Sequence, residues 1–171
     1  DQANIPYLRL GFFGVIDERF DIDLIEKTAT LKPDWQFVLI GPVVKIDSNT
    51  LPQNKNIHYL GNKPYQELPQ YLSEWDVAMI PFAINESTRF ISPTKTPEYL
   101  AAGKPVISSP IRDVVNPYGD SNLVHICDNA FDFVEKVSAE LAVEDKSEWL
   151  SRVDNHLRNI SWDLTFEQMN S

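Results

Sequence analysis

Short apolar runs alternate along this chain with longer segments whose apolar residues recur every three or four positions. The runs have the length of buried strands, and the recurring spacing is that of helices packed through one face. We expect strands at residues 8–14, 35–41, 57–60, 76–80 and 106–108, with a sixth candidate at 123–126. We expect helices after Asp21, at about 65–75, from about 95 to Ala102, at 130–141, at about 150–160 and, as a last short helix, from Ser161.

Strands that alternate with helices imply a parallel sheet with helices on both faces. The predicted fold class is therefore α/β, with a Rossmann-like, doubly wound sheet. The 171 residues suit one domain, with its body at about 8–160 and a C-terminal helix at 161–171. Because the chain lacks an initial methionine and opens with a short polar lead into a strand, we expect it to be a piece of a longer protein.

The most informative stretch, residues 81–110, lies between two of the predicted buried strands and contains a polar loop and a short helix. Gly103 suits the left-handed position that ends a helix. Pro97 has no amide hydrogen and fits a helix only in its first turn. The helix therefore begins after Thr94, with Pro97 third, or after Thr96, with Pro97 first.

Polar side chains gather at the start of this helix. Helix N-termini present unpaired N–H groups and a positive dipole end, which suit phosphate. Ser92 and Thr94 add hydroxyls, Lys95 adds an ammonium, and Glu98 could accept hydrogen bonds from sugar hydroxyls beside the phosphate. Caps and a solvated lysine would explain the same residues, but their place at the carboxyl end of a strand favours an anion site.

The stretch also carries a long ordered motif: Asn85-x-x-Thr88, then Ser92-Pro93-x-Lys95-x-x-Glu98-Tyr99-Leu100-Ala101-Ala102-Gly103-Lys104-Pro105-Val106. This motif resembles the donor-binding segment of GT-B glycosyltransferases of the group 1 (family 4) type. The resemblance covers nearly the whole chain and implies the C-terminal, donor-binding domain, with the N-terminal acceptor domain absent. Phe90 stands where many relatives have the first of two glutamates, and Val15 where they often have arginine.

The resemblance implies a role for each site residue. Cations and helix N–H groups at the diphosphate would stabilise the charge that develops as it leaves, so Lys95 and Arg19 are the candidate catalytic residues. Taken alone, Arg19 could equally be an ordinary surface arginine. The loops that carry Gly61 and Lys63, and Asn85 and Thr88, could equally be ordinary polar turns. The implied contacts are to the diphosphate from Gly14, Arg19, Ser92, Thr94 and Lys95, to ribose from Glu98, to the sugar from Asn85 and Thr88, and to the base from Gly61 and Lys63.

Composition excludes several other classes of function. The net charge of −10 argues against nucleic acid, whose phosphates need a basic surface. The single cysteine, Cys127, cannot form an intrachain disulfide, which suits a reducing compartment. The three histidines lack metal-ligand spacing, and no apolar run approaches the roughly 20 residues of a membrane span. We expect a cytoplasmic protein, with the inner membrane face as a second location.

The predicted function is therefore the donor-binding half of a bacterial glycosyltransferase. It would transfer a hexose-like sugar from a UDP- or GDP-sugar to a glycan or lipid-linked acceptor in polysaccharide biosynthesis. The resemblance implies a retaining, metal-independent reaction without a cofactor, and an isolated domain that is inactive alone. A non-catalytic or degenerate nucleotide-binding domain, and a sugar-nucleotide epimerase of the same architecture, are the alternatives. The sequence leaves open the base, the sugar, the acceptor, the linkage and the oligomeric state.

Overall fold

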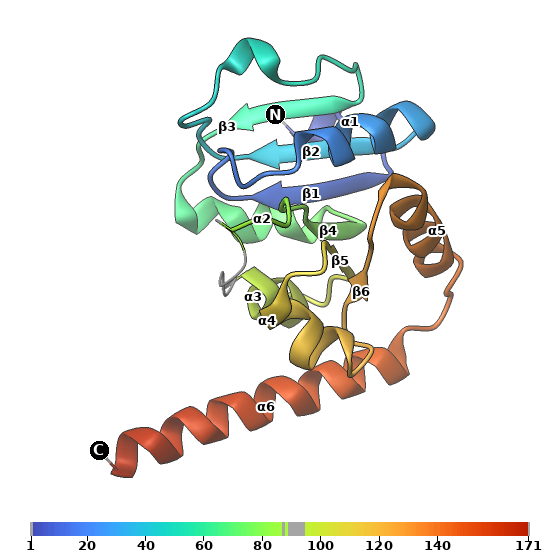
Figure 1. Cartoon of the computed structure of the whole chain (residues 1–171). Coiled ribbons are helices and arrows are strands. Elements are labelled where there is room, and N and C mark those ends of the chain that lie inside the picture. The colour runs from blue at the N-terminus through green and yellow to red at the C-terminus, as the bar shows by residue number, and fades with distance from the viewer. Residues whose placement is uncertain (1, 87, 89–94, 171) are drawn as a thin grey trace.

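The computed structural model describes residues 2–86, 88 and 95–170, with side chains described as far as Arg158. Its strands are β1 (Arg9–Phe13), β2 (Gln36–Ile40), β3 (Ile57–Gly61), β4 (Val77–Ile80), β5 (Val106–Ser108) and β6 (His125–Ile126). These strands form a six-stranded parallel sheet in the order β3-β2-β1-β4-β5-β6 (Figure 1). The chain builds one half of the sheet outward from β1 and the other outward from β4, so its direction reverses between these two strands.

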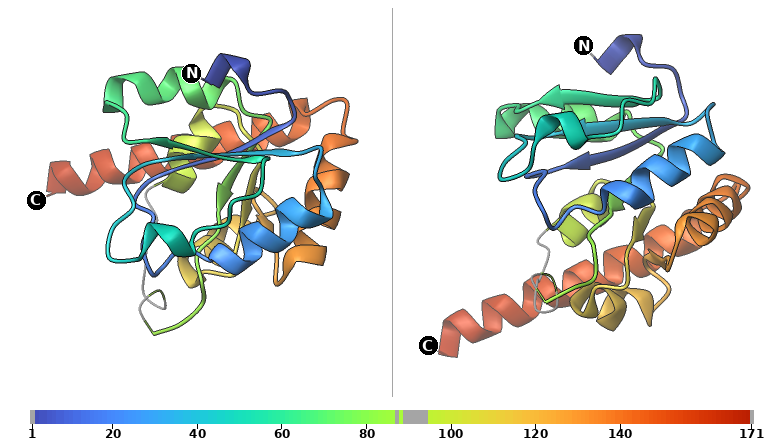
Figure 2. Two further views of the ribbon diagram at one scale, coloured as in Figure 1. Left: turned by 90° about the horizontal axis from the view of Figure 1, so that it is seen from above. Right: turned by 45° about the horizontal axis from the view of Figure 1, so that its top comes forward.

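Helices cover both faces of this sheet. They are α1 (Ile22–Leu31), α2 (Leu68–Ser73), α3 (Lys95–Ala101), α4 (Arg112–Val114), α5 (Ala130–Leu141) and α6 (Ser147–Asn170), with the short turns η1 (Gln2–Asn4), η2 (Ser48–Thr50), η3 (Tyr65–Glu67) and η4 (Val115–Gly119). Figure 2 shows α1 and α5 on one face, and α2, α3 and α6 on the other. The doubly wound α/β fold expected from the sequence is therefore confirmed.

The central strands are buried on both sides. Every residue of β1 and β4 is buried, as is β2 from Phe37 onward. Such strands read as continuous apolar runs because helices cover both of their faces. The ring of Phe37 lies 6.5 Å, between centroids, from that of Phe133 on α5. This contact docks α5 on the sheet through the apolar stripe that its sequence predicts.

The bounds of α3 agree with its proline and glycine. The helix begins at Lys95, which makes Pro97 its third residue and rules out a start after Thr96. Thr94, the other expected cap, lies outside the described residues. Gly103 has a φ of +74°, the left-handed conformation expected for a residue that ends a helix. The helix that carries Lys95 and Glu98 is thus placed by local sequence rules.

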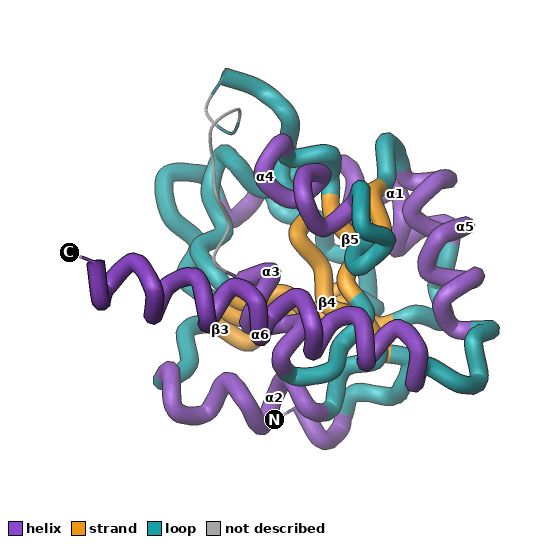
Figure 3. Tube along the Cα trace, turned by 90° about the horizontal axis from the view of Figure 1, so that it is seen from below, coloured by secondary structure: helices purple, strands orange, loops and turns teal. Residues whose placement is uncertain are grey.

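The C-terminal part differs from the prediction. The sequence predicts a helix at about 150–160 and a separate one from Ser161, but α6 is one continuous helix from Ser147 to Asn170. The prediction of a break was wrong because no glycine or proline occurs between those residues. The helix crosses the face of the sheet that α3 covers and packs against α3 (Figure 3).

Two smaller differences also have local causes. The helix expected at about 65–75 is divided into η3 and α2, and Pro69 lies in the first turn of α2, where a residue without an N–H group is tolerated. The short helices α4 and η4 were not predicted. Asn116 inside η4 has non-helical backbone angles and precedes Pro117, so this segment offers no regular periodicity to recognise.

Candidate functional site

The candidate site lies at the carboxyl ends of β1 and β4, where the strand order reverses. β1 pairs with β2 over all five of its residues, but with β4 only at Leu10 and Gly11. The two strands therefore separate towards their carboxyl ends. In doubly wound sheets such a switch point forms the crevice in which ligands bind. The loop after β1 and the start of α3 meet there.

Gly14, the first residue after β1, lies directly against Lys95. A Cβ added to Gly14 would come within 2.6 Å of Lys95 Cε and 3.0 Å of its Nζ, and the φ of Gly14 is +148°. The Lys95 ammonium also lies 5.7 Å from the centroid of the Phe12 ring, within cation–π range. The fold thus brings together two of the residues that the sequence assigns to the diphosphate.

Gly41, which the sequence analysis missed, allows the loop after β1 to pack this closely. This loop begins at Gly14 and is called the glycine loop below. Its φ is +143°, and a Cβ there would lie 1.8 Å from the carbonyl oxygen of Gly14. The Gly14 N–H donates a 2.9 Å hydrogen bond to the carbonyl of Ile40, which holds the loop against the end of β2. The available signal was a glycine immediately after a buried strand, at the same edge of the sheet as Gly14.

The side chains of Lys95 and Glu98 are half-buried. Among the described residues, neither side chain forms a hydrogen bond or an ion pair. Burial lowers the pKa of Lys95; the Glu98 carboxylate opposes this shift and the Arg19 guanidinium adds to it. A bound anion would favour the charged ammonium and reverse the cost of burial. The pair has the chemistry of a site that a phosphate and its neighbouring hydroxyls would complete.

Arg19 is held beside this loop by Asp17, a second residue that the sequence analysis missed. Arg19 Nε lies 3.0 Å and Nη2 lies 2.8 Å from Asp17 Oδ2, and the Asp17 carboxylate is buried. Burial alone would raise the pKa of Asp17, but the hydrogen bonds from Arg19 outweigh it and hold that pKa below its usual value. The guanidinium stays partly exposed, so its contact with a diphosphate stays a prediction.

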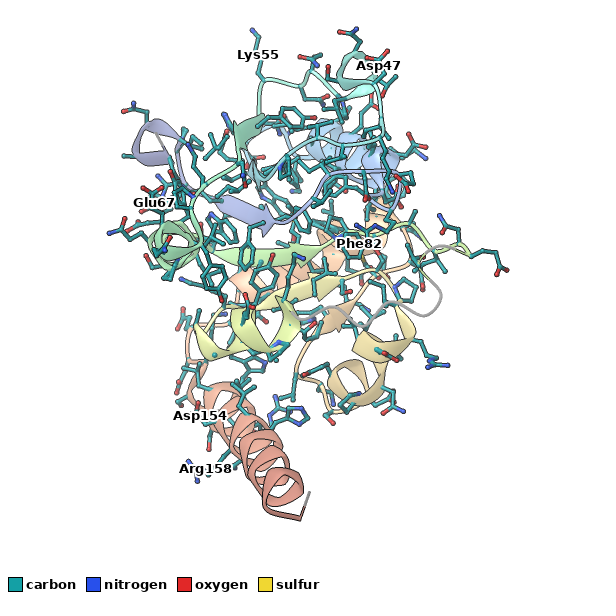
Figure 4. The ribbon with its side chains drawn as sticks, turned by 90° about the vertical axis from the view of Figure 1, so that its left-hand side faces the viewer. Asp47, Lys55, Glu67, Phe82, Asp154 and Arg158 are labelled. Carbon is teal, nitrogen blue, oxygen red and sulfur yellow. The ribbon has the colours of Figure 1, made fainter. Side chains whose placement is uncertain are left out.

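The loop after β1 is also tied to the loop after β4. The backbone carbonyl of Arg19 accepts a 2.7 Å hydrogen bond from the Ala83 N–H, and the Asp21 N–H donates one of 2.7 Å to the Pro81 carbonyl. Asp21 then caps α1 by accepting from the Leu24 N–H at 3.0 Å. Figure 4 shows Phe82 just beyond the end of β4, in the middle of the molecule. These hydrogen bonds hold the two loops together at the carboxyl edge of the sheet.

Glu98 and Lys63, the predicted ribose and base contacts, line two adjoining hollows. Glu98 borders a hollow of about 500 Å³ and Lys63 one of about 320 Å³. Both hollows share the mainly apolar wall of Phe13, Tyr65 and Leu68. Gly14 also lines the smaller hollow. The arrangement leaves room beside the glycine loop for a flat ring and a polar group.

The remaining predicted residues are placed less directly. Gly61 has a φ of +76° and open space where a Cβ would project. Thr88 is buried, and its hydroxyl donates to Ala83 and accepts from the Asn85 N–H at 3.0 Å, so it shapes its own loop. Asn85 is exposed. The sugar contacts of Asn85 and Thr88 stay predictions, and Ser92, like Thr94, lies outside the described residues.

Metal binding and membrane crossing were considered as two other functions of the described residues, and the structure supports neither there. Across residues 2–86, 88 and 95–170, no group of three or more His, Cys, Asp and Glu side chains is arranged to hold a metal ion. In the same part of the chain, no helix combines the length and the apolar character that crossing a membrane requires.

Solved structures share this fold. The chain superposes on Anabaena Alr3699/HepE in complex with UDP-glucose with a TM-score of 0.71 and 12% identity, covering 98% of this chain and 48% of that one. It superposes on the C-terminal domain of LpcC, a glycosyl transferase group 1 family protein of Francisella tularensis, with a TM-score of 0.65 and 16% identity. That match covers 90% of this chain and 84% of the LpcC domain.

Sequence comparison gives the family. TuaH of Bacillus subtilis (strain 168), provisionally named a teichuronic acid biosynthesis glycosyltransferase, is 26% identical over 166 residues. The alignment covers 94% of this chain and 41% of TuaH, so the chain spans less than half of that relative's length. The family described as glycosyl transferases group 1 matches residues 8–142. With fold and sequence in agreement, the chain is a GT-B glycosyltransferase domain and belongs to the glycosyl transferases group 1 family.

Proposed function

We propose that this chain is the donor-binding domain of a glycosyltransferase that takes its sugar from a nucleoside diphosphate. The observation that carries the proposal is the contact between Lys95 and Gly14 at the switch point of the sheet. It places an ammonium that has no ion-pair partner among the described residues against the loop after β1, beside hollows that could take a ribose and a base. Family membership supports the same reading.

The proposed mechanism is electrostatic. When the bond between the anomeric carbon and the diphosphate breaks, negative charge develops on the leaving phosphate. Lys95, with Arg19 held by Asp17, would stabilise that charge from fixed positions, which contributes more than mobile groups in water do. Glu98 would accept hydrogen bonds from the ribose hydroxyls and fix the nucleotide. Retention of configuration and independence from metal ions belong to this proposal.

Solved structures of similar fold support the choice of donor, and the length of a relative supports a separate domain for the acceptor. HepE structures hold UDP, UDP-glucose, and UDP with glucose. A UDP-hexose is therefore our first candidate donor, with a GDP-sugar second. Because the chain spans 41% of TuaH, we propose that a further domain binds the glycan or lipid-linked acceptor. The donor-binding domain alone would then be inactive. Its cytoplasmic location stays a prediction.

Calorimetric titration with UDP, GDP, ADP and CMP tests the proposal. We expect one diphosphate to bind equally well with magnesium and with a chelator. Lys95→Ala should weaken that binding roughly 10- to 100-fold, because a charge-assisted hydrogen bond in a partly buried site is lost. Lys55→Ala is the matched control, since Figure 4 shows Lys55 at an outer tip of the molecule. Saturable binding by none of the four, or equal affinity in the Lys95 variant, would overturn the proposal.

A degenerate nucleotide-binding domain is the second candidate. Val15 supports it, because this side chain is 38% exposed in the glycine loop, where the family often has arginine. Such a domain would bind a nucleotide without supporting transfer. Incubating the full-length protein with UDP-glucose and measuring released UDP separates the two functions. Turnover that is lost in Lys95→Ala indicates an enzyme, and tight binding without turnover indicates the degenerate domain.

A further inference from the structure

Tyr99 connects α3 to the glycine loop through a buried hydrogen bond. It lies four residues after Lys95, so both side chains are on the same face of the helix. Tyr99 is completely buried, and its hydroxyl accepts a 3.3 Å hydrogen bond from the N–H of Phe13, the last residue of β1. Burial raises the pKa of Tyr99, so the phenol stays protonated. The residue that follows Phe13 is Gly14, which lies against Lys95.

The Phe13 N–H needs this partner because β1 and β4 have separated. The Gly14 N–H points to β2, where it donates to Ile40. Successive amides along a strand alternate in direction, so the Phe13 N–H points towards β4. Pairing between β1 and β4 ends at Gly11 and Ala78, before it reaches Phe13. The Tyr99 hydroxyl thus replaces the strand carbonyl that would otherwise satisfy a buried amide.

Aromatic packing fixes the position of this hydroxyl. The Tyr99 ring meets Phe13 edge-to-face at 5.2 Å and Trp75 at 6.2 Å, measured between ring centroids. Trp75 is in turn packed so closely over β1 that a Cβ on Gly11 would lie 2.0 Å from its ring. A side chain held on these sides has little rotational freedom. Its oxygen therefore acts as a rigid spacer between α3 and the end of β1.

We infer that Tyr99 is a positioning residue for the donor site. Its hydroxyl holds the last amide of β1 where the two strands part, and so fixes the separation between Gly14 and the Lys95 ammonium. The donor diphosphate would bind beside Gly14 and the Lys95 ammonium, so the inference rests on the proposed function. Tyr99 does not touch the donor; it acts through the backbone of Phe13 and Gly14.

Tyr99→Phe is the test, because it keeps the ring and its packing and removes only the hydroxyl. Tyr59→Phe is the matched control: it also removes a tyrosine hydroxyl, from a half-buried side chain that donates to the Pro52 carbonyl at 2.9 Å. Two measurements are compared with the wild-type chain: amide hydrogen exchange of Phe13 and Gly14 by NMR, and the affinity for UDP and GDP. We expect faster exchange confined to these two amides and nucleotide affinity weakened roughly three- to tenfold. We expect Tyr59→Phe to change neither.

The two measurements separate this inference from the proposed function. If wild-type chain binds no nucleotide, the proposed function fails, and amide exchange alone decides whether Tyr99 holds the loop. Unchanged exchange at Phe13 in Tyr99→Phe would overturn the inference. So would wild-type affinity in a variant whose Phe13 amide exchanges faster, because the loop would then move without consequence. Equal effects in both phenylalanine variants would also count against it, since they would reflect general loosening of the fold.

Discussion

Two charged clusters in this domain are organised in opposite ways. At the carboxyl edge of the sheet, Lys95 and Glu98 form no ion pair or hydrogen bond with the residues that the structure describes. Near the starts of β5 and β6, the Glu140 carboxylate is bound from both sides. Its Oε2 lies 2.9 Å from His125 Nε2, and its Oε1 lies 3.0 Å from Lys146 Nζ.

The difference separates the cluster that we propose binds the diphosphate from a cluster that stabilises the fold. Burial alone would raise the pKa of Glu140, but the hydrogen bonds from His125 and Lys146 outweigh burial and hold that pKa below its usual value. Burial of Lys95 is not compensated in this way, and its pKa is lowered as well. A lowered pKa means that the charged form of a carboxylate is stabilised. For a lysine it means that the charged form is destabilised.

The largest effect we expect is on the backbone that builds the first cluster. Gly41→Ala would place a Cβ 1.8 Å from the Gly14 carbonyl oxygen, in a conformation with φ of +143°. Neither backbone can yield cheaply, so the free energy of unfolding should fall by about 3 kcal/mol or more. Urea denaturation measures this. Gly61→Ala is the control, since it has φ of +76° but nothing within 4 Å of the new atom, and should cost only about 1–2 kcal/mol. Equal costs would show that the glycine loop is not tightly packed on β2.

The second cluster should affect stability and leave binding unchanged. Glu140→Gln removes the charge that His125 and Lys146 share, and should lower the free energy of unfolding by about 1–3 kcal/mol. Because the pKa of Glu140 is lower in the folded state, its contribution is present above the unfolded value near 4.5 and is lost as pH falls through the folded value. Melting temperatures below that pH should therefore converge for wild type and variant. A change in UDP or GDP affinity would contradict a purely structural role.

Much of the first cluster could be predicted from sequence, and its limits are instructive. Apolar runs predict the strands, and the family resemblance predicts that Gly14 and Lys95 contact the same diphosphate. The closeness of Gly41 to Gly14 could not be predicted, because it depends on how tightly one loop packs on another. Nor could the bond between Tyr99 and Phe13, which are 86 positions apart. It exists because β1 and β4 separate, and no periodicity in the sequence records where a ladder ends.

The smallest effect we expect concerns the titration of Lys95, and it distinguishes a binding cation from a structural one. Because burial lowers its pKa below the ordinary 10.5, the ammonium should be lost at a lower pH than that of an exposed lysine. Diphosphate affinity should therefore fall as pH rises through the alkaline range, by roughly tenfold once the charge is gone.

Lys95→Arg supplies the reference for this titration, since arginine stays charged throughout that range. Its profile reports any titration of the nucleotide itself, and the difference between the two profiles belongs to Lys95. Calorimetry at a series of pH values measures both. Parallel profiles would mean that the Lys95 charge does not contact the ligand, and the distinction between the two clusters would then fail. A steeper decline for the lysine would support binding of the diphosphate beside the ammonium, because the affinity follows the titration of Lys95 only if anion binding raises the pKa of that group.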